Sequence, residues 1–524
     1  MNKRFQNYPW IIIFAAIILG YFYFLDNRPV IGVDASAYLC LARAISEGKG
    51  YTNIWLLGNS PHVKFPFLFP LLLAPLVFFF GYNFFVLKFL VVLTALLSFW
   101  GIYNLIKRLQ PVFVVYVLLL TCASLHVFRY SHTILSEMPY LCFSIFFLFC
   151  ALRFLEEQTC INKWGVMAGI FFLGAYFSRG IGISLLPALI LTLVLTPQDK
   201  ELKKQKLFFI YAILLLPVIC WLLRGFLFRP DYSKGYIDAM FYNSSDPHGE
   251  CVSFTAFLIT FIRNLYAFIF YAVPNVLSSI NFSGRNLLSF LLSVLTGWGF
   301  LKCMKKKRTI IEWYVFFYML VLLVWPWSNI EGTRLLIPLI PFIFYYCLHG
   351  IDGFLEFKSL IKYKKILFNL FVFLLLFINI SNLAGHIIAV SQEKYNNTAA
   401  KDFIKLSSWL KNNTSPEAVL LAYPSALPAL YMWSERKGVL IESMDMPEKT
   451  RDILLNKEKI LNIIRTNGIN YIVVFNLQFN SDEMKTAVSL IADKVSIVYN
   501  NKGNIIYEVD KKKINRAIPL MRSQ

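Results

Sequence analysis

Long apolar runs separated by short polar segments dominate the first 389 residues. A helix needs about 20 apolar residues to cross a bilayer, and runs close to this length recur along this part of the chain. They predict about eleven membrane-spanning helices, at residues 9–25, 84–106, 111–130, 138–154, 165–178, 181–196, 207–226, 286–303, 310–326, 335–350 and 366–388. The pattern therefore predicts an α-helical polytopic membrane protein over residues 1–389.

Two further apolar runs, 65–81 and 251–275, are interrupted. The first contains three prolines and the second an arginine near its middle. Prolines disturb a helix and a charged side chain at the bilayer centre is costly. We therefore expect both runs to form helices that lie at the outer interface, within two outer loops at 26–83 and 227–285.

The pattern changes after residue 389. Residues 390–524 contain no span-length apolar run, and short β-rich segments alternate there with helical patterns. The β-rich segments are AVLLA, GVLIE, INYIVVF, VSIVYN and NIIYEV. Such alternation predicts a soluble α/β domain with a mainly parallel sheet, large enough to hold its own core.

Composition and charge support a membrane protein. The chain is 57% hydrophobic and 15% charged, whereas soluble proteins carry about 25% charged residues, so an ordinary soluble enzyme and a disordered chain are both excluded. The net charge of +21 does not indicate nucleic acid, because the positive residues cluster at alternate ends of the predicted spans. The positive-inside rule then predicts a plasma (inner) membrane protein with a cytoplasmic N-terminus and an extracytoplasmic C-terminal domain.

Five short motifs follow one another along the membrane part: DASAYLCLARAISEGKGY, HVKFPFLFPLL, SEMP, SRGIG and GTRLLIPLIPF. In this order the chain resembles the polytopic glycosyltransferases that use polyprenyl-phosphate sugars. This group includes the protein O-mannosyltransferases (glycosyltransferase family 39) and the lipid A aminoarabinose transferase, and it shares the GT-C fold. The sequence departs from the pattern at KFPF, where the second proline element is loosened, and at Thr333, where an aromatic or basic residue often stands.

The resemblance implies that a sugar is transferred, with inversion, from undecaprenyl or dolichyl phosphate to an acceptor outside the cytoplasm. The implied partners are this donor and an acceptor lipid, glycan or protein, with no nucleic acid. A hydroxyl nucleophile needs a base within reach, and a leaving phosphate needs cations. The sequence requires no cofactor, and it leaves the role of a divalent metal and the oligomeric state open.

The resemblance assigns Asp34 as the catalytic base or acceptor-orienting acid and Glu137 as a second acid. From the residues alone, Asp34 could equally cap the helix that follows it, and Glu137 could be an acid at a helix N-terminus before Pro139. Lys64, Arg179 and Arg334 are the candidates for binding the donor phosphate. Their alternative role is to reach the lipid head groups from the ends of spans.

Several polar residues of the predicted outer side are further candidates for lining the site: Tyr38, Arg129, His132, His248 and Glu250. The loop 229–250 has the composition of a lid over the site, and equally of an ordinary solvated loop. His126 and His132 lie six residues apart, a spacing that does not place them on one helix face, so no metal site is predicted there.

Two other functions compete with glycosyl transfer. One is a transporter or flippase of lipid-linked or envelope glycan, although ion-coupled transporters usually keep ionisable groups at mid-membrane depth and the predicted topology places no acidic residue there. The other is a ligase or polymerase that uses a pyrophosphate-linked glycan, which the sequence separates poorly from the first prediction.

Overall fold

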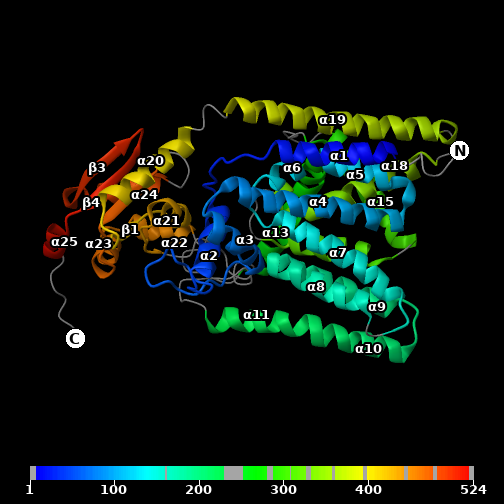
Figure 1. The fold of residues 1–524 in the computed structure, drawn as a ribbon, viewed down its shortest axis with the longest axis horizontal. Coiled ribbons are helices and arrows are strands. Elements are labelled where there is room, and N and C mark those ends of the chain that lie inside the picture. The colour runs from blue at the N-terminus through cyan, green and yellow to red at the C-terminus, as the bar shows by residue number, and fades with distance from the viewer. Residues whose placement is uncertain are drawn as a thin grey trace.

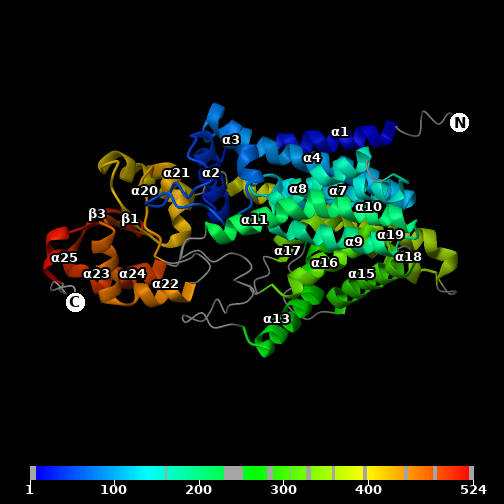
Figure 2. The same cartoon turned by 90° about the horizontal axis from the view of Figure 1, so that it is seen from below.

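The computed structural model describes residues 8–159, 162–228, 252–279, 287–306, 308–325, 332–356, 360–393, 398–441, 447–475 and 481–517. A bundle of long helices forms one end of the molecule and a small α/β domain forms the other. The short helices α2 (Val33–Ser46) and α3 (Leu68–Phe80) lie between these two parts in both views (Figures 1 and 2). An apolar core runs through the bundle and continues into the α/β domain.

The bundle helices coincide with the predicted spans. In chain order they are α1 (Tyr8–Tyr23), α4 (Phe84–Leu109), α5 (Val114–Ala123), α6 (Leu125–Ser131), α7 (Glu137–Glu156), α8 (Lys163–Ser178), α9 (Leu185–Leu195), α10 (Lys200–Ile210), α11 (Leu216–Leu227), α15 (Leu287–Lys306), α16 (Ile310–Leu323), α17 (Gly332–Leu336), α18 (Ile340–Phe354) and α19 (Lys364–Glu393). Among the described residues, seven helices are long and apolar enough to cross a membrane, and the pair α5–α6, bent by 59°, makes an eighth. The prediction of a polytopic helical membrane protein is confirmed.

The two interrupted apolar runs, 65–81 and 251–275, form helices of different length. The first forms α3 (Leu68–Phe80), whose 13 residues span about 20 Å and so fall short of the bilayer core of about 30 Å. The second is a continuous helix through α13 (Phe254–Ala267), a π-helical turn and α14 (Val273–Ser278). Its 25 residues have the length and composition of a membrane-spanning helix, whereas the sequence predicted a helix that lies at the interface.

Two glycines bring α15 and α18 into close contact. A Cβ added at Gly299 would lie 1.8 Å from the carbonyl oxygen of Tyr346, and one added at Gly350 would lie 1.9 Å from that of Leu295. Only residues without a side chain allow two helix backbones to approach this closely, a device typical of membrane helices.

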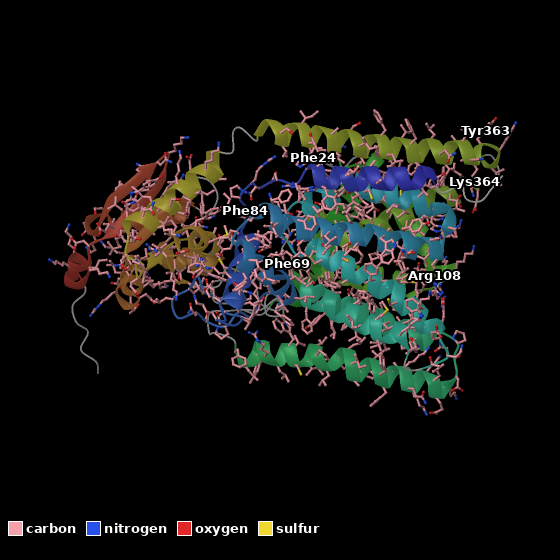
Figure 3. All side chains as sticks on the ribbon, viewed as in Figure 1. Phe24, Phe69, Phe84, Arg108, Tyr363 and Lys364 are labelled. Carbon is pink, nitrogen blue, oxygen red and sulfur yellow. The ribbon has the colours of Figure 1, made fainter. Side chains whose placement is uncertain are left out.

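The basic clusters gather at the end of the bundle away from the α/β domain. Figure 3 places Arg108 and Lys364 at that end. Ion pairs connect its loops: Arg108 pairs with Glu156, and Lys364 pairs with both Asp352 (2.9 Å) and Glu356 (3.2 Å).

The α/β domain contains α20 (Thr398–Asn413), α21 (Leu427–Ser434), α22 (Pro447–Leu454), α23 (Lys457–Thr466), α24 (Ser481–Leu490) and α25 (Lys511–Ala517) around a four-stranded sheet. The strands β1 (Leu420–Leu421), β2 (Tyr471–Val474), β3 (Val495–Asn501) and β4 (Asn504–Val509) are ordered β1-β2-β4-β3. Of the four strands in the described residues, β1 and β2 pair in parallel, while β2–β4 and β3–β4 are antiparallel. The prediction of a mainly parallel sheet is therefore wrong, because the last two strands form a hairpin.

Candidate active site

Asp34 lies in the first turn of α2 (Val33–Ser46), at the end of the bundle that faces the α/β domain. The N-cap of this helix is Gly32, and no side chain caps it, so the capping role that the sequence also allowed for Asp34 is excluded. The carboxylate instead forms an ion pair of 2.7 Å with Nη2 of Arg334. Its side chain keeps 27% of its surface exposed, so it remains accessible to a substrate.

Glu137 is the first residue of α7 and is almost completely buried, with 1% of its side chain exposed. Its Oε1 accepts hydrogen bonds from Nη1 of Arg179 and, at 2.5 Å, from Nε of Arg334. Among the described residues Oε2 has no hydrogen-bond partner. Burying a carboxylate is costly unless it is paired, and two arginines meet that requirement here.

The two arginines come from different elements. Arg179 terminates α8, and Arg334 lies in α17. Arg334 connects the two acids, because its Nε donates to Glu137 and its Nη2 forms an ion pair with Asp34. Four of the residues that the sequence singled out therefore form one connected cluster of charges.

Lys64 adds a third cation. It precedes α3, and its Nζ lies 5.5 Å from the centre of the Phe65 ring. Burial alone would raise the pKa of the Asp34 carboxyl, but the positive charges of Arg334, Lys64 and Arg179 outweigh it and hold this pKa below its usual value. Asp34 is consequently ionised at neutral pH.

Ser136 is a member of the cluster that the sequence did not single out. The hydroxyl of Tyr38, from the first turns of α2, lies 3.0 Å from its Oγ, and Nη1 of Arg179 donates to the same oxygen at 3.4 Å. This contact places Tyr38 beside the cluster. The SEMP motif contained the signal, because Ser136 directly precedes Glu137.

His62 is a second residue that the sequence did not single out. Its Nδ1 lies 2.6 Å from Oδ1 of Asn53, and its Nε2 accepts a hydrogen bond from the backbone nitrogen of Phe65 at 2.9 Å. Burial, together with the positive charges of Lys64 and Arg224, lowers its pKa to about 3. The neutral ring thus fixes the turn from which Lys64 projects.

The remaining candidates are not part of the cluster of charges. Arg129 is exposed on α6. Both ring nitrogens of His132 lie against backbone carbonyl oxygens, Nδ1 at 2.8 Å from Phe128 and Nε2 at 2.9 Å from Tyr21, so this ring ties α6 to α1. His248 and Glu250 lie outside the described residues. Within the described part of the chain, no group of three or more His, Cys, Asp or Glu residues is placed to hold a metal ion.

Part of the chain is similar to a known protein family, and the whole chain is similar to several solved structures. Residues 64–223 match the family described as dolichyl-phosphate-mannose-protein mannosyltransferase. No curated protein matches the chain. Among solved structures, ArnT from Cupriavidus metallidurans bound to undecaprenyl phosphate is similar with a TM-score of 0.60 at 13% identity, covering 95% of this chain and 98% of that chain.

Two further structures share the architecture. The oligosaccharyltransferase AglB from Archaeoglobus fulgidus, in complex with an inhibitory peptide and a dolichol-phosphate, has a TM-score of 0.59 at 12% identity and covers 99% of this chain and 75% of that chain. The arabinofuranosyltransferase AftD from Mycobacteria has a TM-score of 0.51 at 12% identity, covering 97% and 40%.

The chain therefore has the polytopic helical fold that ArnT, AglB and AftD share. Residues 64–223 carry the similarity to the mannosyltransferase family, and the arrangement of the whole chain is similar to that of ArnT.

Proposed function

We propose that the protein transfers a sugar from a polyprenyl-phosphate donor to an acceptor on the extracytoplasmic side of the membrane, with inversion at the anomeric carbon. The observation that carries the proposal is the convergence of Lys64, Arg179 and Arg334 beside Asp34, from three separate elements. Three cations around one partly exposed carboxylate suit a reaction in which a base works next to a leaving phosphate. The ArnT structure, bound to undecaprenyl phosphate, supports this donor class.

In the proposed reaction an acceptor hydroxyl attacks the anomeric carbon of the donor sugar. Asp34 takes the hydroxyl proton as the new carbon–oxygen bond forms. The bond from the anomeric carbon to the phosphate oxygen breaks on the opposite face, and the polyprenyl phosphate leaves with the electron pair. Lys64, Arg179 and Arg334 stabilise the charge that develops on this phosphate.

Glu137 has a different role in this proposal. Its burial and its two arginine partners suit a positioning residue better than the second catalytic acid that the resemblance suggested. It holds Arg179 and Arg334 at a fixed separation, which preorganises the phosphate site and lowers the reorganisation needed when the donor binds.

The sidedness is also a proposal. The basic ends of the bundle helices lie opposite the α/β domain, and Lys/Arg residues favour the cytoplasmic side. The cluster of charges and the α/β domain then face the extracytoplasmic side, in the plasma membrane. This placement agrees with a donor whose sugar is presented outside the cytoplasm.

The decisive experiment measures sugar release from radiolabelled undecaprenyl- and dolichyl-phosphate sugars by the purified protein in the presence of membranes. Asp34→Asn should lower kcat by roughly 10²- to 10⁴-fold while donor affinity is kept. Glu137→Gln should instead weaken donor binding, because it loosens Arg179 and Arg334 from the positions in which Glu137 holds them. Asp352→Asn, at the opposite end of the bundle, is the control.

Turnover that persists in Asp34→Asn would exclude Asp34 as the base. If the folded wild-type protein releases no sugar from any phosphate-linked donor, the proposed donor class is wrong, and pyrophosphate-linked glycans become the next substrates to test.

A further inference from the structure

Helix α2 connects the cluster of charges to the α/β domain. Its first turn carries Asp34, and residues Ala35–Ala42 and Ala44 are buried. In Figure 1 the helix lies next to α3 on one side and to the α/β domain on the other. A buried helix moves as a rigid body, so whatever holds its C-terminal end also sets the position of Asp34.

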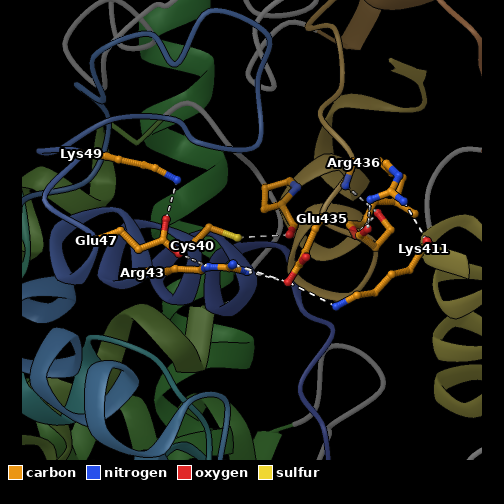
Figure 4. Close-up of polar contacts among 10 residues, drawn as sticks. Cys40, Arg43, Glu47, Lys49, Lys411, Glu435 and Arg436 are labelled. Carbon is orange, nitrogen blue, oxygen red and sulfur yellow. Dashed lines mark hydrogen bonds and ion pairs between the residues drawn. The ribbon is translucent and has the colours of Figure 1, made fainter. Parts of the chain in front are cut away.

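The C-terminal half of α2 is held by residues of the α/β domain (Figure 4). The Sγ of Cys40 donates to the carbonyl oxygen of Pro428 at 3.2 Å. Nη1 and Nη2 of Arg43 each lie 3.4 Å from Oε1 of Glu435, and Arg43 also pairs with Glu47 at 2.5 Å. Lys411 of α20 reaches the same Glu435 oxygen at 3.3 Å.

Glu435 occupies a position that a helix ordinarily gives to glycine. It ends α21 in the left-handed conformation, with φ of 60°. Glycine is favoured at such a cap because a side chain is strained there. A glutamate at this position joins three elements, α20, α21 and α2, through a single carboxylate, whereas glycine would join none.

The loop that carries Lys64 is held by the same domain, through its backbone. The nitrogen of Leu57 donates to the carbonyl oxygen of Gly438 at 3.0 Å, and the nitrogen of Gly438 donates to that of Trp55 at 2.8 Å. Gly438 forms parallel bridges with both Leu56 and Leu420 of β1, so the loop extends the edge of the sheet. A Cβ at Gly438 would come within 2.2 Å of the Leu427 side chain, which leaves little room for any other residue.

We propose that the α/β domain is part of the active-site scaffold, with Glu435 and Gly438 as positioning residues that hold α2 with Asp34 and the loop with Lys64. Neither residue touches the reacting atoms. Glu435 acts through Arg43, and Gly438 acts through the backbone at residues 55–57. This inference rests on the proposed function for the roles of Asp34 and Lys64.

The variant that tests the proposal is Glu435→Gly, measured in the full-length protein. It removes the carboxylate and also relieves the strained backbone, so the thermal unfolding midpoint should stay the same or rise. We expect kcat to fall roughly 10- to 100-fold, the range that a misplaced catalytic group produces, while KM for an undecaprenyl-phosphate sugar stays within about twofold. The matched control is Lys502→Gly, which relieves a positive φ of 52° in the β3–β4 turn.

A double-mutant cycle provides the second arm. Arg43→Gln and Glu435→Gly should each lower kcat, and the double variant should be little slower than the slower single variant, since both changes remove the same contact. Unchanged kcat in Glu435→Gly, or losses that simply multiply in the double variant, would overturn the role of Glu435.

Amide hydrogen exchange makes the test independent of turnover. Exchange in α2 should become faster in Glu435→Gly, and exchange of the Leu57 amide should become faster in Gly438→Ala. If wild-type protein shows no turnover, the proposed function fails, yet these exchange rates still report on the scaffold. Unchanged exchange in both variants would overturn the scaffold itself.

Discussion

Single residues around the cluster of charges differ in how they respond to pH. His62 is buried and neutral, and its Nε2 must stay unprotonated to accept the hydrogen bond from Phe65. Its pKa of about 3 in the folded protein lies below the ordinary value of about 6.5. A lowered histidine pKa contributes stability that is complete above the unfolded value and is lost as pH falls toward the folded value.

We therefore predict an acid-sensitive contribution to stability from His62 between about pH 6.5 and pH 3. The thermal unfolding midpoint of the wild-type protein should fall over this range. His62→Gln, which cannot take up a proton, should show a shallower fall, although its midpoint at pH 7.5 should be lower. The two pH profiles, measured in one detergent, provide the check, and parallel profiles would contradict the prediction.

The sequence identified the charged residues of the cluster but not their contacts. The sequence motifs contained Asp34, Lys64, Glu137, Arg179 and Arg334, and the structure brings these charges together. The sequence could not show that Glu137 is buried between two arginines, because residues 137, 179 and 334 become neighbours only through helix packing. The sequence likewise could not show the contact of His132 with the backbone of Tyr21, which is 111 residues away.

At the scale of helices and strands, the close crossing of α15 and α18 depends on two glycines. Gly350→Ala should destabilise the protein by about 1–3 kcal/mol or more, because its Cβ would meet the backbone oxygen of Leu295. In Gly297→Ala, on α15, the added Cβ meets nothing within 4 Å, so this variant should be neutral or stabilising by up to about 1 kcal/mol. Thermal unfolding of the two variants in detergent provides the comparison. Equal unfolding midpoints for the two variants would contradict the prediction, because they would show that the close contact between α15 and α18 does not contribute to stability.

The elements were predicted correctly where the apolar runs were long. The sheet was predicted wrongly because a turn decides the direction in which two of its strands pair. Span-length runs gave helices at every predicted position. The error in the sheet came from the turn between β3 and β4, where Lys502 and Gly503 both have positive φ, 52° and 82°. A Lys-Gly pair flanked by asparagines between two β-rich runs is a hairpin signal, and it makes these two strands antiparallel.

At the scale of the whole molecule, the opposite ends of the bundle should face opposite sides of the membrane. In a cysteine-free background, Glu417→Cys in the α/β domain should react with a membrane-impermeant maleimide on intact cells. Lys365→Cys at the basic end should react only after permeabilisation, because lysines and arginines are retained on the cytoplasmic side. Both positions are exposed in the structure, so burial does not explain a difference. The reverse pattern would invert the proposed sidedness.

The contact between the loop that carries Lys64 and the edge of the sheet also affects when the site can form during synthesis. Asn59 and Lys437, which are hydrogen-bonded across that junction, are separated by 378 residues. At a synthesis rate of about 5–20 residues per second, the loop waits roughly 20–75 s on the ribosome-bound chain before its partner emerges. During that interval the early helices can insert, but the loop with Lys64 has no sheet to join. Under the proposed function, the loop with Lys64 therefore reaches its catalytic position only after Lys437 has been synthesised.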